Sequence, residues 1–320
     1  MVRTACASLF AILITLSTAP ALAAEGYPQQ PIRIIIPFSP GGATDVLART
    51  LSDKLEGVLG TNIVIDNRGG AGGTLGTAIA ARAAPDGYTL LFTSPSYTFT
   101  PTIYKNLPYD PLKDFKSITV VATVPNILAV HPSMPVNSVR QLIALARKHP
   151  GEIGFGSGGR GSNIHLTTEL FAYMAKIKLL HVPYKGGGPA QIALMSGEVQ
   201  MMMAGLASAL PFIKSGRMRA LAVTSKKRSS ALPDLPTIDE SGVPGYVKEY
   251  WAGLFAPAGV PEPIITRVYQ AVAEALKSPE IVKRLAAQGA SPGGDPSAEF
   301  DAFVRDEILT WSKLIREMKL

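Results

Sequence analysis

Cysteine and histidine are scarce in this sequence. The only cysteine among 320 residues is Cys6, in an N-terminal segment that we expect to be removed, and no small-residue run precedes it as in a lipoprotein signal. The mature chain would therefore have no disulfide, thiolate metal site or cysteine nucleophile. The four histidines (His131, His149, His165 and His181) include no pair at metal-ligand spacing on a helix and no H-E-x-x-H motif. We expect no metal and no cofactor.

Nucleotide-binding and nucleophile motifs are also missing. No glycine-rich turn reads as a P-loop, and none fits G-x-G-x-x-G with a following acidic residue. Ser157 and Ser162 lie among glycines, but Phe155 and Arg160 stand where G-x-S-x-G needs glycine. His165, one turn beyond Ser162, could act as a base, although a histidine in the first turn of a helix is more often structural. We therefore predict a protein that is not an enzyme, with a serine hydrolase as a remote alternative.

The charge of the chain is mildly positive and dispersed. The formal net charge is +7, and it falls to +6 without Arg3. The longest basic cluster, at 226–228, has no interleaved aromatic residues, so we expect no nucleic-acid partner. A mild positive balance is better suited to attracting anionic solutes.

The first 24 residues have the pattern of a secretory signal peptide. Arg3 precedes an apolar stretch at Leu9–Leu16, which is too short to span a bilayer and is closed by Pro20. An A-x-A signal at 21–23 predicts cleavage near Ala23 or Ala24. We therefore expect an exported protein.

Strands and helices alternate in the first hundred residues after this segment. The apolar run Ile32–Ile36 is typical of a strand buried on both faces of a parallel sheet. Leucines at every fourth position over Leu47–Leu59 predict a helix that ends at Gly60. Strands are expected again at Asn62–Asp66 and Tyr88–Ser94, so the order is βαβαβ with a mostly parallel sheet.

The middle of the chain predicts a second α/β unit. A strand is expected at 126–131, a helix behind a Ser138/Gln141 capping box, and another helix at about Asn163–Ala175. Further strands and a helix that begins near Pro189 follow.

The C-terminal part predicts a strand at 249–257 and three helices, the second and third capped by Ser278 and Ser297. Trp251 and Trp311 are interpreted as packing residues. We predict two α/β domains joined by strand crossovers, one formed by residues 25–125 plus 245–320 and the other by 126–244.

Three glycine-rich turns each follow a strand and lead into a helix. They lie at Ser39–Asp45, Gly156–Ser162 and Tyr184–Ala190. In an open α/β sheet such turns gather beyond the carboxyl ends of the strands, where helix N-termini present free N–H donors. We expect a cleft that holds an anion from both sides, a carboxylate rather than a phosphate. Thr44 or Asp45 could also simply cap the helix that begins there.

Motifs over nearly the whole mature chain resemble one family. Among them are "IRIIIPFSPGGATD", "IDNRGGAGGTLGT", "PDGYTLLF", "GSGGRGSNIHLTTELF", "HVPYKGGGPA" and "GLFAPAGVP". They are similar to the solute-binding receptors of tripartite tricarboxylate transporters, often called Bug-type receptors. The resemblance implies a type II periplasmic binding protein fold of two α/β domains with a ligand cleft between them. It also implies a periplasmic location and delivery of an organic acid to the permease subunits of the transporter.

The resemblance further implies the ligand-binding residues. Ligand carboxylates would be held largely by backbone N–H groups and ordered water. Carried over position by position, the three family loops fall on Pro40, Gly41, Gly42, Ala43, Thr44 and Asp45, on Ser157, Gly158, Gly159, Gly161, Ser162 and His165, and on Tyr184, Lys185 and Gly186. Ser94 and Ser96 would face the cleft mouth, although a serine after a strand is by default only a turn residue.

Two departures from the family pattern bear on the ligand. Ala204 and Gly205 stand where many members carry an acidic or amide residue, so an amino acid is a less suitable ligand. Arg160 could pair with a second carboxylate or could be a solvated loop arginine. We therefore favour a dicarboxylate or an aromatic carboxylate and expect a monomer. A ligand-sensing role toward a periplasmic sensor domain is the alternative from another functional class.

Overall fold

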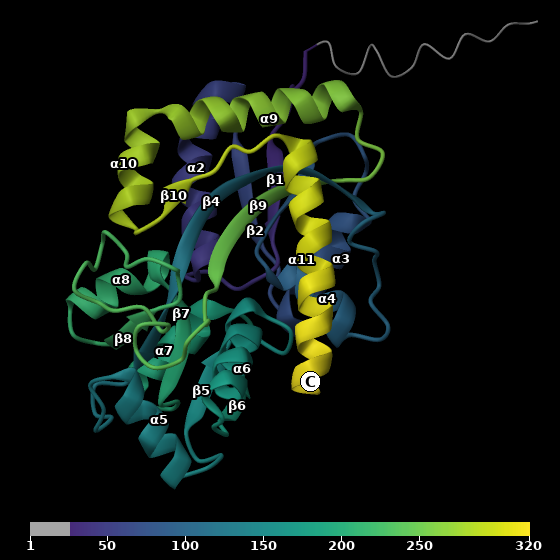
Figure 1. Cartoon of the computed structure of the whole chain (residues 1–320). Coiled ribbons are helices and arrows are strands. Elements are labelled where there is room, and N and C mark those ends of the chain that lie inside the picture. The colour runs from purple at the N-terminus through teal and green to yellow at the C-terminus, as the bar shows by residue number, and fades with distance from the viewer. Residues whose placement is uncertain (1–25) are drawn as a thin grey trace, which may run out of the picture.

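A computed structural model describes residues 26–320 (Figure 1). The expected signal peptide, its cleavage site and Cys6 lie outside the described residues. The strands form one mixed sheet in which the path runs β2-β1-β3-β9-β4-β7-β5-β6, with β8 and β10 also paired to β4. Their bounds are β1 Ile32–Ile36, β2 Ile63–Asn67, β3 Thr89–Thr93, β4 Phe115–Val130, β5 Gly154–Ser157, β6 Leu180–Pro183, β7 Met201–Gly205, β8 Arg219–Val223, β9 Glu249–Pro257 and β10 Ser291–Pro292.

The long strand β4 joins two α/β units (Figure 1). Its first part pairs with β9, and its last five residues pair with β7. The chain returns to the first unit through β9, and the Lys248 backbone N–H donates to the Thr224 carbonyl at the crossing. This arrangement confirms the predicted two-domain fold with strand crossovers. The exact boundaries at 125 and 245 stay a prediction.

The parallel pairing expected for the first three strands is confirmed, but the sheet as a whole is mixed. β1 pairs in parallel with β2 and β3, and β5 pairs in parallel with β6 and β7, as βαβ units require. β9 is antiparallel to β3 and β4, and β4 is antiparallel to β7 and β8, because both strands cross between the units. β4 also begins at Phe115, eleven residues before the predicted strand.

Helices cover both faces of the sheet. In Figure 1, α9 and α10 lie over the first unit, and α11 runs down its side toward the second. α11 packs against α4 and β4 and touches α6. The bounds are α2 Ala43–Leu59, α3 Thr74–Ala81, α4 Ser96–Ile103, α5 Val139–Lys148, α6 Asn163–Ala175, α7 Gly187–Ser196, α8 Leu206–Lys214, α9 Glu262–Lys277, α10 Pro279–Ala287 and α11 Ser297–Met318, with a short 3₁₀ turn η1 at Ala71–Gly73.

Several helix ends follow the sequence signals. α2 ends at Gly60, whose left-handed φ of 71° lets its N–H donate to Glu56. Ser138 caps α5 by accepting from the Gln141 N–H, and Ser278 caps α10 in the same way. The expected limits of α6, Asn163–Ala175, are also confirmed.

Two predicted caps differ in the structure. The N-cap of α2 is Gly42, without a side-chain cap, and the Asp45 carboxylate instead accepts from the Gly41 N–H at 3.0 Å. α11 has Pro296 as its N-cap, and the Ser297 hydroxyl donates to the Ile118 carbonyl at 2.7 Å. In both cases the side-chain oxygen forms a hydrogen bond with a backbone group other than the first-turn N–H that the sequence pattern predicted.

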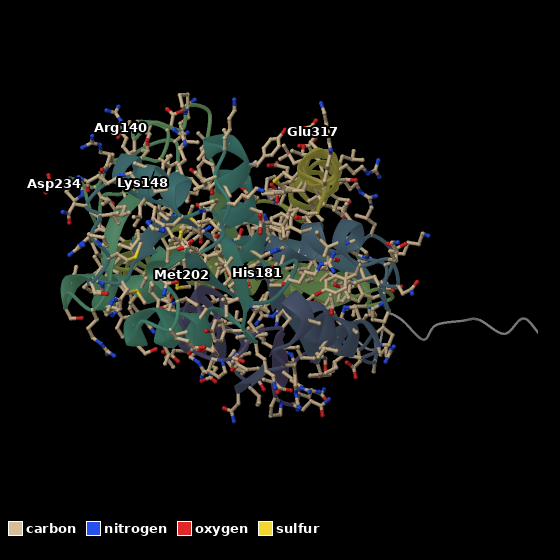
Figure 2. The ribbon with its side chains drawn as sticks, turned by 90° about the horizontal axis from the view of Figure 1, so that it is seen from below. Arg140, Lys148, His181, Met202, Asp234 and Glu317 are labelled. Carbon is tan, nitrogen blue, oxygen red and sulfur yellow. The ribbon has the colours of Figure 1, made fainter. Side chains whose placement is uncertain are left out.

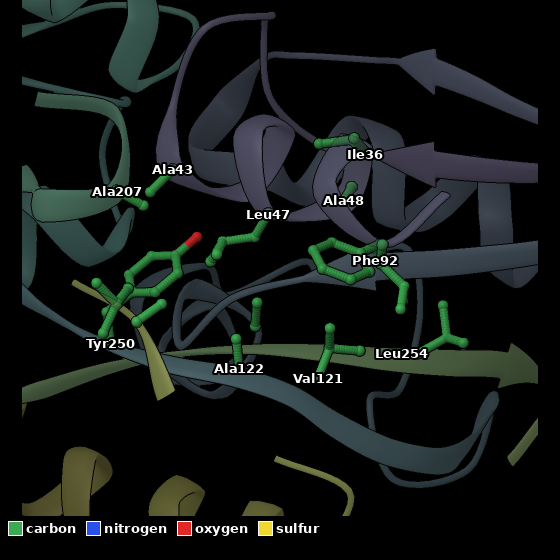
Figure 3. Close-up of a cluster of buried hydrophobic side chains, with 14 of the residues drawn as sticks. Ile36, Ala43, Leu47, Ala48, Phe92, Val121, Ala122, Ala207, Tyr250 and Leu254 are labelled. Atoms are coloured by element: carbon green, nitrogen blue, oxygen red, sulfur yellow. The ribbon is translucent and has the colours of Figure 1, made fainter. Parts of the chain in front are cut away.

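The largest hydrophobic core lies between the sheet and α2, α9 and α10. Leu47 of α2 faces the strands that carry Phe92 and Val121 (Figure 3), and these three residues belong with Leu51 to one buried cluster. Each buried aliphatic or aromatic side chain contributes about 1.5–3 kcal/mol, so this packing fixes the position of the first helix turn.

Charged side chains of both signs are distributed around the molecule, for example Arg140, Lys148, Asp234 and Glu317 (Figure 2). Among residues 26–320, we find no helix with both the length and the apolar character that crossing a bilayer requires.

Candidate functional site

The three glycine-rich turns meet at one place, between the two units. Gly42, Gly158 and Gly187, one from each turn, line the same small cavity. The Ser39 N–H donates to the Lys185 carbonyl at 3.1 Å, which ties the first turn to the third. The predicted convergence of these turns is therefore observed.

The cavity is small and its lining is neutral. Its volume of about 30 Å³ leaves room for one or two water molecules. The lining residues are Phe38, Gly42, Ala43, Thr44, Ser94, Ser96, Asn126, Gly158, Ser162, Asn163, Ile164, Gly187, Gly205 and Tyr250. The lining thus offers hydroxyl, amide and backbone groups but no carboxylate, ammonium, guanidinium or imidazole.

Four helices begin at this cavity. The N-caps of α2, α6, α7 and α8 are Gly42, Ser162, Gly186 and Gly205, and only Ser162 supplies a side-chain cap. An uncapped first turn leaves N–H groups available to a ligand, and each helix dipole adds partial positive charge there. The arrangement is therefore suited to an anionic group.

Two buried asparagines face this region without hydrogen-bond partners. Asn126 of β4 is 0% exposed, and Asn163, the first residue of α6, is 3% exposed. Neither the Oδ1 nor the Nδ2 atom of either side chain has a partner among the described residues. An unpaired buried polar group costs about 1–3 kcal/mol, so a ligand or ordered water is needed to satisfy these amides.

Hydroxyl groups complete the polar lining. The Tyr250 hydroxyl lies 2.5 Å from Thr44 Oγ1, and Figure 3 shows this hydroxyl directed toward the start of α2. Burial raises the pKa of Tyr250 to about 12, so the phenol stays protonated. Ser96 Oγ accepts from the Asn163 N–H at 2.9 Å and lies 3.1 Å from Ser94 Oγ. These contacts fix the hydroxyls in place.

Backbone contacts between glycines close the cleft. Gly41 and Gly42 lie against Gly187 and Gly188, and a Cβ built on Gly188 would lie 3.2 Å from the Gly41 carbonyl carbon and closer still to the Pro40 oxygen. We call these five residues, Pro40, Gly41, Gly42, Gly187 and Gly188, the closing seam. A side chain at Gly188 would therefore hold the two units apart.

The predicted site residues divide between the lining and its surroundings. Eight line the cavity, namely Gly42, Ala43, Thr44, Ser94, Ser96, Gly158, Ser162 and Gly205. Twelve lie outside the lining, namely Pro40, Gly41, Asp45, Ser157, Gly159, Arg160, Gly161, His165, Tyr184, Lys185, Gly186 and Ala204. Their contact with a ligand stays a prediction in every case.

Asp45 is the centre of a supporting network. Its carboxylate accepts from the Gly41 N–H, from Arg49 Nε at 3.1 Å and from Asn67 Nδ2 at 3.0 Å. It therefore fixes the first glycine turn from behind. Arg160 and Lys185 are exposed.

Two histidines support the second turn. The ring centroids of His165 and His181 are 4.1 Å apart, and Phe155 stacks on His181 (the position of His181 is labelled in Figure 2). Burial lowers the pKa of His165 to about 3, with smaller contributions from His181 and Arg160, and burial lowers that of His181 to about 4. His181 Nε2 lies 2.6 Å from Ser157 Oγ, so neutral histidines hold this turn.

Six lining residues were not among those predicted from the sequence, namely Phe38, Asn126, Asn163, Ile164, Gly187 and Tyr250. Gly187 belongs to the third glycine turn and could have been included on that ground. An asparagine in the otherwise apolar run 126–130 was also a usable signal, because a buried amide needs a partner. The inward position of Tyr250 depends on strand pairing and has no local signal.

No group of three His, Cys, Asp or Glu side chains within residues 26–320 could hold a metal ion.

Comparisons with known proteins agree on one family. The sequence profile described as "Tripartite tricarboxylate transporter family receptor" matches residues 47–320. "Protein BugT" of Bordetella pertussis is 38% identical over 307 residues, which are 95% of this chain and 94% of that protein.

Two solved structures are similar in both sequence and fold. "R. palustris Rpa4515 with adipate" has a TM-score of 0.89 and 38% identity, covering 92% of this chain and 98% of that one. "MatC (Rpa3494) from Rhodopseudomonas palustris with bound malate" has a TM-score of 0.87 and 31% identity, covering 90% of this chain and 100% of that one. The chain therefore belongs to the tripartite tricarboxylate transporter receptor family, whose members are periplasmic solute-binding proteins with two α/β domains.

Proposed function

We propose that this protein captures an organic carboxylate, a dicarboxylate or an aromatic carboxylate, in the cleft between its two units and passes it to the permease subunits of a tripartite tricarboxylate-type transporter. The observation that carries the proposal is the pair of unpartnered amides, Asn126 and Asn163, at a cavity where four helices begin. The adipate and malate bound by two similar proteins support a dicarboxylate. Export of the chain to the periplasm is part of the same proposal.

Neutral hydrogen-bond donors would recognise the carboxylate of the ligand. Backbone N–H groups at uncapped helix starts and the amide Nδ2 atoms can donate to carboxylate oxygens, while hydroxyls orient the acid. Hydrogen bonds to a charged acceptor contribute about 1.5–3 kcal/mol each, so a few suffice for micromolar affinity. The present cavity volume of about 30 Å³ requires the cleft to widen before an acid enters, through the hinge formed by β4 and β9.

Binding without turnover is part of the proposal. The Ser162 hydroxyl accepts from the His165 backbone N–H at 3.3 Å and acts as a helix cap. His165 Nδ1 accepts from the Gly161 N–H at 3.2 Å rather than from a serine hydroxyl. A Ser162→Ala variant should therefore show no lost turnover on ester or amide substrates.

The first test is a thermal-shift panel on the chain without residues 1–24. The panel contains C3–C8 dicarboxylates, tricarboxylates, amino acids and aromatic acids, with calorimetry on each hit. A specific ligand stabilises the folded state, so we expect a shift confined to one chemical class. A flat panel would contradict carboxylate capture.

The second test replaces the amide that carries the proposal. Asn126→Leu keeps the number and branching of the side-chain heavy atoms and removes both unpartnered polar atoms, so the free energy of unfolding should not fall by the cost of a lost hydrogen bond. Affinity for the acid identified by the panel should fall about tenfold or more, which corresponds to about 1.4 kcal/mol. Asn137→Leu, at an exposed position, is the matched control and should bind normally. Normal binding by Asn126→Leu would refute the assigned role.

A further inference from the structure

A second, larger cavity lies on the other face of the hinge strands. Its volume is about 440 Å³, within the usual range for small-molecule sites. Trp251 of β9 lines it, whereas the preceding residue, Tyr250, lines the cleft. Successive strand residues point to opposite faces, so the two cavities lie on opposite sides of β9.

Aromatic side chains form the wall of this cavity. Trp251, Phe300 and Phe303 pack edge to face, with the Trp251 ring centroid 5.5 Å from that of Phe300 and 6.0 Å from that of Phe303. Trp311 also lines it, and Phe303 is 41% exposed at its rim. The faces and edges of these rings offer a wide apolar surface.

The charge around this wall is predominantly negative. Four carboxylates line the cavity, those of Glu249, Asp295, Glu299 and Glu307, against one ammonium, that of Lys248. None of the four forms a salt bridge with another residue in the described part of the chain. An uncompensated excess of carboxylates beside an apolar wall favours a cationic occupant.

The chain itself shows that the wall accepts an ammonium. Lys248 Nζ lies over the Trp311 ring, 4.7 Å from its centroid, which is cation–π geometry. Glu307 lies deeper and accepts from Trp251 Nε1 at 3.1 Å. Burial raises the pKa of this carboxyl, while the hydrogen bond from Trp251 and the nearby Lys248 ammonium act in the opposite direction.

A buried polar group without a partner is also present at this wall. Asn163, whose amide has no hydrogen-bond partner among residues 26–320, lines this cavity as well as the cleft. We propose that this cavity is a second ligand site, separate from the carboxylate cleft, for an organic ammonium ion with an aromatic or other apolar body. The apolar body would pack on Trp251 and Phe303, and the ammonium would pair with Glu307.

Tryptophan fluorescence gives a direct test, because both tryptophans of the chain wall this cavity and neither lines the cleft. The protein is titrated with phenethylammonium and with its neutral analogue 2-phenylethanol, and calorimetry measures the affinities. We expect a saturable fluorescence change with the ammonium and at least about tenfold weaker binding of the alcohol. The acid panel and this titration use different ligands and different readouts, so failure of one proposal is distinguishable from failure of the other.

Variants localise the site. Glu307→Gln keeps an oxygen for Trp251 Nε1 and should weaken phenethylammonium binding about tenfold. The exposed Glu274→Gln on α9 is the matched control and should bind normally. If Glu307→Gln does not fold, the exposed rim pair Asp295→Asn with Glu299→Gln replaces it, with a loss of about threefold or more.

Three results would contradict the proposal of a second site. No saturable signal up to about 10 mM amine would overturn the proposal. Equal affinity for the amine and the alcohol would do the same, as would normal amine binding by Glu307→Gln and the rim pair.

Discussion

Replacing Gly188 with alanine should keep the cleft from closing while leaving the fold intact. Gly188 lies in the first turn of α7, at the closing seam. A Cβ at this position would lie 3.2 Å from the carbonyl carbons of Pro40 and Gly41, and nearer still to the Pro40 oxygen. Ordinary carbon contacts need about 3.5–4.0 Å, so the two sides must separate by about 1 Å or more.

The size of the effect follows from overpacking. An inserted methyl group in a tight contact costs about 1–3 kcal/mol, and here the open conformation avoids that cost. Because apparent affinity scales with the fraction of molecules able to close, the Kd of the bound acid should rise about 5- to 150-fold. The unfolding free energy should instead hold or rise by about 0.5–1 kcal/mol, because alanine is a better helix former than glycine.

Calorimetry with the acid selected by the thermal-shift panel measures the first effect, and urea unfolding measures the second. X-ray scattering with saturating acid should show a larger radius of gyration for Gly188→Ala than for the unchanged protein. Gly57→Ala is the matched control, because Gly57 lies in α2 with no atom within 4 Å of its built Cβ. Unchanged affinity of Gly188→Ala would refute the reasoning, because it would mean that binding does not need the closing seam.

Two further predictions concern stability. The buried His165 and His181 stay neutral in the folded state, with pKa values of about 3 and 4, against 6.5 when exposed. Neither histidine affects stability above pH 6.5. As the pH falls from 6.5 toward 4, these two histidines take up protons only in the unfolded chain. The free energy of unfolding of the unchanged protein should therefore fall more steeply with falling pH than that of His165→Gln. Equal slopes in urea unfolding from pH 7 to pH 4.5 would contradict this. Tyr250→Phe leaves Thr44 Oγ1 without the hydroxyl that lies 2.5 Å away, so the free energy of unfolding should fall by about 1–3 kcal/mol. Tyr173→Phe, at an exposed position, should leave the free energy of unfolding almost unchanged. A loss below about 0.5 kcal/mol in Tyr250→Phe would count against a stabilising role of this hydrogen bond.

Helices and strands were predicted well from the sequence where one local pattern was strong. Leucines at every fourth position located α2, and Gly60 ended it because glycine takes the left-handed conformation without strain. The alternation of strands and helices predicted two α/β domains, and the position of the glycine turns after strands predicted their convergence. These features depend on residues that are adjacent in the sequence or on motifs in a fixed order.

Features that depend on tertiary pairing were not predictable in the same way. The extent of β4 and the antiparallel direction of β9 follow from pairing between segments more than a hundred residues apart. Tyr250 and Asn126 reach the cleft only because those two strands cross there. The capping role expected of Ser297 was wrong because the Ile118 carbonyl, 179 positions away, accepts its hydroxyl.

The unpartnered amides also explain why closure should require a ligand. In the closed arrangement, four amide atoms of Asn126 and Asn163 are buried with no partner among the described residues. Each unsatisfied group costs about 1–3 kcal/mol, whereas an open cleft would let water reach them. The closed form is therefore stable only when a polar occupant, an acid or ordered water, pairs with the amides. A ligand shifts the equilibrium only by its difference in affinity for the two forms, and these asparagines provide that difference at the site itself.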